Sequence, residues 1–183
     1  MLQVKRWCDD LIGLLLPNLC NACGAAVYHS EDLICTKCPY DLPFTDYHQH
    51  GENRVAKQLW GRVLFNAAMA MLYFRKGAKV QNLIHNLKYN GRTDVGVLLG
   101  GLLGERPKVS SFYQDVDLVI PVPLHHKKYK YRGYNQGTFI AEGIADKMEI
   151  GFSEKNLVRN NATESRLKKT VTTALKICRT FLA

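Results

Sequence analysis

The sequence contains no long hydrophobic run, no internal repeat and no low-complexity segment. No stretch of 18 apolar residues occurs among its 183 residues, so we expect no helix inserted in a membrane. The apolar run at residues 11–16 follows basic residues, as in a secretion signal, but Asp9 and Asp10 interrupt this region and no small-residue cleavage site follows. We therefore expect an amphipathic N-terminal helix that ends at Pro17, and a cytoplasmic protein.

Acidic residues are scarce relative to basic ones. The 16 Asp and Glu residues face 25 Lys and Arg residues, which gives a formal net charge of +9. Such a charge suits a polyanionic ligand, a nucleic acid or an acidic partner, without choosing among them. A hydrophobic content of 46% supports a folded core, and an aromatic content of 10% argues against a disordered chain. The length is enough for one ordinary domain and a small appendage.

Four of the six cysteines form two C-x-x-C pairs, Cys20 with Cys23 and Cys35 with Cys38, separated by eleven residues. Paired knuckles of this kind predict a zinc site, because each tight turn directs two thiolates at one ion. Four thiolates complete a tetrahedral shell, so the site is expected to be structural. Disulfides and a redox C-x-x-C pair are the alternatives. The absence of a secretion signal favours zinc over disulfides, and the absence of a redox context favours zinc over iron.

Residues 117–136 form the stretch around which the rest of the chain is organised. An apolar run at residues 118–120 predicts a short buried strand, which Pro121 and Pro123 end. A loop dense in cationic donors follows, Gly133 allows a tight turn, and Asn135 caps a predicted helix over residues 136–148. A strand, a cationic loop and a helix N-terminus together predict a phosphate or pyrophosphate site. The alternative is a surface connection that happens to be basic.

Two further helices are predicted before this stretch. Residues 79–89 have apolar residues at helical spacing, and Gly91 is placed to stop that helix. Residues 94–103 predict a second helix that Gly104 closes. The apolar segment at residues 63–74 fits either two strands or one helix. This order of elements indicates an α/β domain. The candidate phosphate-binding residues are Lys88, Lys127, Lys128, Arg132, Gly133, Asn135 and Gln136.

These features resemble the ComF family of phosphoribosyltransferase-like proteins, which includes the GntX proteins. The resemblance rests on the cysteine knuckles and on His-Asn-Leu-Lys-Tyr-Asn-Gly at residues 85–91. It rests above all on Pro-Val-Pro-Leu-His at residues 121–125, followed by Arg-Gly-Tyr-Asn-Gln at residues 132–136. The matching features occur in order over roughly residues 1–165.

The resemblance implies a small four-cysteine zinc module joined to a type I phosphoribosyltransferase-like parallel sheet, with helices on its faces. In this interpretation residues 1–45 hold the N-terminal helix and the zinc module, and residues 46–165 hold the N-terminal part of the transferase-like domain. The implied ligand is phosphoribosyl pyrophosphate with Mg²⁺. Arg132 and Gly133 would lie at the turn of the pyrophosphate loop, and Asn135 and Gln136 would open the helix. The resemblance also implies a link to DNA uptake in competence through a partner helicase, and it identifies no catalytic residue.

The chain departs from the family pattern after Ser165. Type I phosphoribosyltransferases carry an acidic pair followed by a Thr-Thr-Gly-type loop, and neither occurs after residue 136. The segment at residues 166–176 is RLKKTVTTALK. A nucleotide sequence that encodes it can, when the reading frame is shifted by one base, be translated as QTKKDRYNRFE, which resembles the expected continuation of the family. We therefore expect residues 166–183 to be an aberrant, frameshifted tail, the sheet to be incomplete and the transferase to be inactive. The alternative is a genuine short paralogue whose tail is helical.

Two classes of function remain. One is an enzyme by descent, of the phosphoribosyltransferase and hence glycosyltransferase type. The other is a zinc-containing module that binds nucleic acid or a partner protein without catalysis. Residues 127–134 mix cations with tyrosines, as proteins that bind single-stranded DNA do. A pyrophosphate loop accounts for the same residues more economically.

Overall fold

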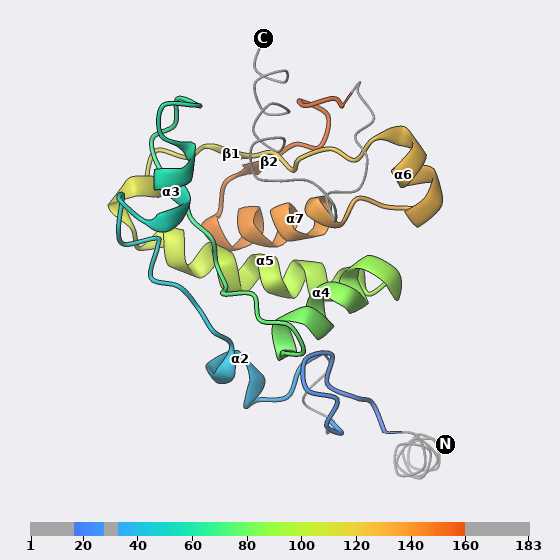
Figure 1. The fold of residues 1–183 in the computed structure, drawn as a ribbon. Helices are drawn as coiled ribbons and strands as arrows, with labels where there is room; N and C mark the ends of the chain where they lie inside the picture. The colour runs from blue at the N-terminus through green and yellow to red at the C-terminus, as the bar shows by residue number, and fades with distance from the viewer. Residues whose placement is uncertain (1–16, 28–32, 160–183) are drawn as a thin grey trace. The chain divides into compact units, whose positions relative to one another are not determined.

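The structure, a computed structural model, describes residues 17–27 and 33–159 (Figure 1). The predicted N-terminal helix and the predicted aberrant tail lie outside the described residues. Within them, no helix is long and apolar enough to cross a membrane. The chain divides into two compact units. The first combines the residues up to Phe44 with Leu72–Val95, and the second combines Thr45–Met71 with the residues from Gly96 onward.

The first unit is built from the cysteine segment, the short helix α2 (Cys38–Asp41) and helix α4 (Lys79–Tyr89). The predicted helix over residues 79–89 is confirmed with the same bounds. Its buried face carries Val80, Leu83 and Leu87 at helical spacing, which is why the segment is amphipathic. Gly91 follows the helix with φ +66°, a conformation that glycine adopts without steric cost, so the predicted helix stop is also confirmed.

The second unit contains helix α3 (Arg54–Leu59), most of helix α5 (Thr93–Lys108) and a 3₁₀ turn, η1 (Ser111–Tyr113). Strand β1 (Leu118–Val119), helices α6 (His126–Arg132) and α7 (Gln136–Met148) and strand β2 (Gly151–Phe152) follow. The strands β1 and β2 pair in parallel, with Leu118 opposite Gly151. Helix α7 packs against both strands and lies between them and α5 (Figure 1). The described sheet is small and parallel, within a mixed α and β unit.

Helices α5 and α7 approach each other through glycines. A Cβ atom on Gly100 would collide with the Ile140 carbonyl oxygen, and one on Gly143 would collide with the Val97 carbonyl oxygen. At Gly104, a Cβ would lie 2.9 Å from the Cβ of Lys147. The prediction that Gly104 closes its helix is therefore wrong. The helix continues to Lys108, because this glycine serves the close packing of two helices and does not terminate one.

Three other predicted elements need correction. The strand expected at residues 118–120 covers only Leu118 and Val119, and it is not buried, since Leu118 is 39% exposed. The cationic loop expected before Gly133 is the helix α6, because no proline or glycine interrupts residues 126–132. The apolar segment at residues 63–74 forms neither a helix nor a strand pair. It is irregular apart from an isolated antiparallel bridge between Leu72 and Phe44.

Candidate metal centre and cationic helix pair

The four predicted zinc ligands lie together in the first unit. The Sγ atoms of Cys20, Cys23, Cys35 and Cys38 all lie within 4.8 Å of one another. The first knuckle is the turn of a small hairpin, closed by the antiparallel bridge between Leu19 and Ala26. The second knuckle leads into α2, whose first residue is Cys38. The predicted convergence of the four cysteines is confirmed, and the cluster could hold a metal ion such as zinc.

The spacing of the sulfur atoms fits one tetrahedral ion. A Zn–S bond of about 2.3 Å implies an S–S edge of about 3.8 Å in a regular tetrahedron. Three of the six separations are 3.7 Å for Cys20–Cys38, 3.7 Å for Cys23–Cys35 and 3.5 Å for Cys35–Cys38, and all six lie within 4.8 Å. All four cysteines are free thiols, and no His, Asp or Glu joins the cluster among the described residues. The donor set is therefore sulfur alone, which suits a structural zinc site.

The electrostatics of the cluster also favour a cation. Burial works to raise the pKa of the Cys20 thiol, but hydrogen bonds from the backbone amides of Cys23, Cys35 and Ala22 lower it to about 6. Burial and the neighbouring sulfurs raise the pKa of Cys38 far above its ordinary value. One thiolate therefore forms readily, and the last resists ionisation because negative charge accumulates in a confined space. A divalent cation relieves that repulsion.

A pair of charged side chains stands beside the cluster. Lys79, the first residue of α4, donates to the Asp41 carboxylate at α2 over 2.8 Å. The pKa of Lys79 is raised first by this bond and also by the charges of Cys38 and Cys23. A zinc ion with four thiolates carries a net charge of about −2, so the ammonium group lies where it offsets part of that charge.

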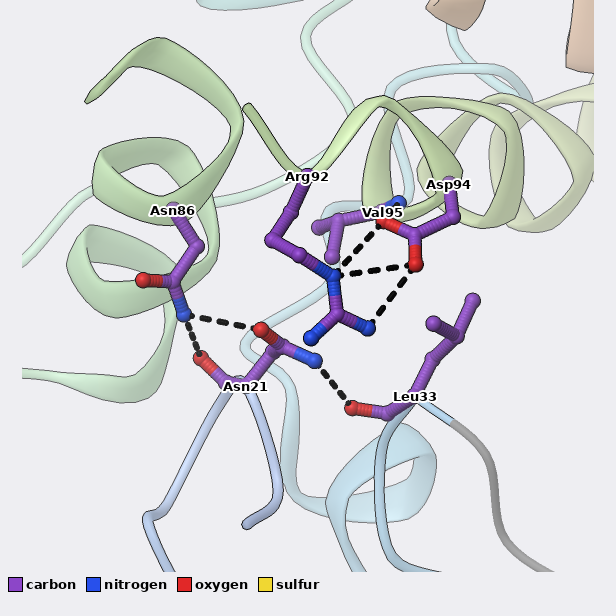
Figure 2. A network of polar contacts seen from close by, with 6 residues as sticks. All are labelled: Asn21, Leu33, Asn86, Arg92, Asp94 and Val95. Carbon is purple, nitrogen blue, oxygen red and sulfur yellow. Dashed lines mark hydrogen bonds and ion pairs between the residues drawn. The ribbon is translucent and has the colours of Figure 1, made fainter. Parts of the chain in front are cut away.

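Two asparagines from α4 hold the first knuckle, and the sequence interpretation gave them no role; Figure 2 shows one of them, Asn86. The Asn86 Nδ2 atom donates to both the backbone oxygen of Asn21, at 3.1 Å, and its side-chain oxygen, at 3.0 Å. One turn earlier, the Asn82 Nδ2 atom donates to the Ala22 carbonyl over 2.8 Å. The Asn21 side chain in turn donates to the Leu33 carbonyl, just before the second knuckle. The sequence signal was two asparagines four residues apart on an amphipathic helix.

The predicted phosphate-binding residues fall into two groups. Lys88 is in α4, in the first unit, whereas the other six belong to the second unit. Lys127 and Lys128 are in α6, and Arg132 ends that helix. Gly133 has φ +80°, so the predicted tight turn at this position is confirmed. The predicted helix start is confirmed as well, since Asn135 caps α7 and Gln136 is its first residue.

Several polar groups at the start of α7 form hydrogen bonds within the protein. The Asn135 side chain is buried, accepts from the Gly137 amide over 3.1 Å and donates to the Val122 carbonyl over 3.1 Å. Arg132 donates to the Gln136 side chain over 2.7 Å. Asn135 is therefore a structural cap that joins α7 to the segment after β1.

A cavity of about 780 Å³ opens beside α6. Its cationic wall contains Lys130, Lys155 and Arg159 beside one carboxylate, that of Glu154, and the Tyr129 ring supplies an aromatic surface. Pro123 and Leu124 contribute apolar walls, together with residues that follow β2. The size is within the range of small-ligand pockets, and the lining combines apolar surface with positive charge. The residues beyond β2 were not singled out from the sequence, because the pairing of β2 with β1 brings them to α6.

Comparison with curated proteins finds distant relatives. The chain is similar to the DNA utilization protein YhgH from Shigella flexneri and from two strains of Escherichia coli, with 24% identity over 153 residues in each case. The matched region covers 81% of this chain and 63% of each relative, so the chain spans less than two thirds of their length. No family profile matches the chain. No solved structure matches it either.

Proposed function

We propose that this protein binds one structural zinc ion through Cys20, Cys23, Cys35 and Cys38 and takes part in the handling of DNA. The single observation that carries the zinc assignment is the sulfur geometry, with three of the six separations at 3.5–3.7 Å, close to the edge of a zinc tetrahedron, and all six within 4.8 Å. The link to DNA rests on similarity to relatives named for DNA utilization. Membership of the ComF and GntX group, and a role in competence with a partner helicase, are the finer form of the same proposal.

We further propose that the second unit binds a phosphorylated ligand beside α6 and α7. The cationic wall of the cavity supports this, since Lys130, Lys155 and Arg159 concentrate positive charge next to an apolar surface. The parallel β1–α7–β2 unit supports a phosphoribosyltransferase-like domain, and the capped start of α7 is where such a fold holds an anion. Phosphoribosyl pyrophosphate with Mg²⁺ is the ligand that this interpretation predicts.

A second candidate ligand for the same surface is single-stranded DNA. Helix α6 exposes Tyr129 by 48% and Tyr131 by 86%, and lysines alternate with these rings. Exposed aromatic rings between cations provide surfaces on which bases stack, while the cations contact phosphates. This candidate retains the zinc module as a scaffold and requires no catalysis.

Three measurements test these proposals separately. Metal analysis of the purified protein is expected to give one zinc per chain, and Cys38→Ser is expected to lose it; a wild-type chain without bound metal would refute the zinc assignment. Calorimetry with phosphoribosyl pyrophosphate and Mg²⁺, repeated with Arg159→Ala and Lys130→Ala, tests the phosphorylated ligand. A gel shift with single-stranded DNA at several salt concentrations tests the alternative, for which affinity must fall steeply with salt. Binding of neither ligand would refute both functions of the cationic surface.

A further inference from the structure

The contacts of the first knuckle show how helix α4 acts on the metal centre. The trans peptide between two residues points its carbonyl and its N–H in opposite directions. The Asn21 carbonyl accepts from Asn86, and the Ala22 carbonyl accepts from Asn82. On the other side of these same peptides are the N–H groups of Ala22 and Cys23, which lower the pKa of the Cys20 thiol, as donors directed at its sulfur do.

We propose that Asn82 and Asn86 are positioning residues of the metal centre, which aim two backbone N–H groups at the Cys20 sulfur by holding the carbonyls of the same peptides on α4. This inference rests on the proposed zinc site. The hydrogen bonds from both asparagines to the knuckle go to oxygen atoms and not to a cysteine sulfur. Each asparagine therefore acts on the sulfur only through the orientation of a peptide plane. N–H donors to a coordinating sulfur stabilise its thiolate and keep it directed at the ion.

Asn86 makes a second hydrogen bond to Asn21, and this bond constrains the second knuckle. Its Nδ2 atom also donates to the Asn21 Oδ1 atom at 3.0 Å, and this contact leaves the Asn21 amide free to donate to the Leu33 carbonyl at 2.8 Å (Figure 2). The Asn21 backbone N–H donates to the same carbonyl at 3.0 Å. Leu33 precedes Cys35 by two residues, and the Cys35 amide donates to the Cys20 sulfur at 3.2 Å. Asn86 therefore supports donors to this sulfur from both knuckles.

Helix α4 also orients the Asn86 amide. The Asn90 Nδ2 atom donates to the Asn86 Oδ1 atom over 2.7 Å, so the Asn86 oxygen is occupied and its NH₂ group faces the knuckle. The Arg92 backbone N–H donates to the Asn86 carbonyl, and Arg92 pairs with Asp94 (Figure 2). The arrangement requires an NH₂ group at position 86, because both atoms that it contacts in the knuckle are oxygens. A carboxylate there would face two acceptors.

The experiment measures zinc affinity by competition with a chromophoric chelator, at one fixed pH, on the full chain. Asn86→Ala is expected to weaken zinc binding by about 10-fold or more, as the loss of outer-shell partners of a metal site typically does. Asn86→Asp is expected to weaken it further, and Asn82→Ala to weaken it less, because Asn82 makes one contact with the knuckle and Asn86 makes two. The matched control is Gln81→Ala, on the same helix and similarly half-buried, which loses a hydrogen bond from the Gly77 amide outside the knuckle and is expected to bind zinc as the wild type does.

Amide hydrogen exchange of the zinc-loaded protein distinguishes positioning from general stabilisation. Asn86→Ala is expected to accelerate exchange at the Ala22 N–H, and Asn82→Ala at the Cys23 N–H, each with little effect on the other site. Unchanged zinc affinity in Asn86→Ala, or equal acceleration at both amides in both variants, would overturn the inference while leaving the zinc site intact. A wild-type chain that does not bind zinc would overturn both. If a variant does not fold, Asn90→Ala provides a milder test, because it frees the Asn86 oxygen without removing its NH₂ group.

Discussion

The close approach of α5 and α7 makes Gly100→Ala the most demanding test of the fold. An added Cβ would collide with the Ile140 carbonyl oxygen and would lie 2.9 Å from the Gly143 Cα. Carbon atoms prefer separations of about 3.5–4.0 Å, so the helices would have to separate by several tenths of an ångström or more. The two backbones are just as close at Gly143, where a Cβ would collide with the Val97 carbonyl oxygen. Lys147 also pairs with Glu105 across the two helices over 2.8 Å. Separation of the helices would disturb both contacts.

The magnitude follows from two opposing effects. Overpacking in a close-packed interior costs about 1–3 kcal/mol. Replacement of a helical glycine by alanine stabilises a helix by about 0.5–1 kcal/mol, since glycine loses more conformational freedom on folding. The neighbouring Gly101 isolates the second effect, because a Cβ there meets nothing within 4 Å. Both variants share the helix stabilisation, so it cancels between them, and Gly100→Ala is expected to be less stable than Gly101→Ala by the overpacking cost of about 1–3 kcal/mol.

Urea unfolding of the zinc-loaded protein, followed by far-ultraviolet circular dichroism, measures this difference. With a urea m-value of about 1–3 kcal/mol/M, the two midpoints should differ by about 1 M. Because the chain has two compact units, amide exchange in α7 should show that the loss falls in the second one. If Gly100→Ala is as stable as Gly101→Ala, the helices do not approach as described, and the packing argument is refuted.

Three other perturbations test separate parts of the structure. Asn135→Ala removes both the cap of α7 and a buried bond to the segment after β1, so urea unfolding should show a loss of about 1–2 kcal/mol, and an unaltered midpoint would contradict the capping role. The Arg92 guanidinium lowers the pKa of Asp94 below its ordinary 3.8, so this pair stabilises the fold above that pH, and its contribution is lost as the pH falls through the lowered pKa. Asp94→Asn should therefore reduce the loss of stability at acid pH. An unchanged loss of stability at acid pH would show that this pair does not contribute to it. Chelation of zinc should lower the melting temperature of the wild type and leave that of Cys38→Ser unchanged, whereas equal shifts in both would show that the chelator acts elsewhere.

Local chemistry made several features predictable from the sequence. The C-x-x-C spacing predicted that four sulfurs converge, because each pair lies within one turn and only the two turns have to meet. The apolar period of residues 79–89 predicted α4 with its bounds, since both its buried face and its glycine stop are local signals. Asn135 and Gly133 were predictable for the same reason: a cap and a turn depend on a few neighbouring residues.

Other features required the tertiary structure. Gly104 has the sequence signature of a helix stop, and only the passage of α7 beside it shows that the glycine admits a neighbouring helix. The cavity joins α6 to Lys155 and Arg159, which the pairing of β1 with β2 brings together from distant parts of the chain. Asn82 and Asn86 are ordinary polar residues of a helix face until the first knuckle is placed against them. The sequence by itself determined which residues can hold a metal and where α4 and α7 begin and end, because those signals are local. Only the tertiary structure decided which backbone groups support the metal ligands, because those contacts join residues more than sixty positions apart in the chain.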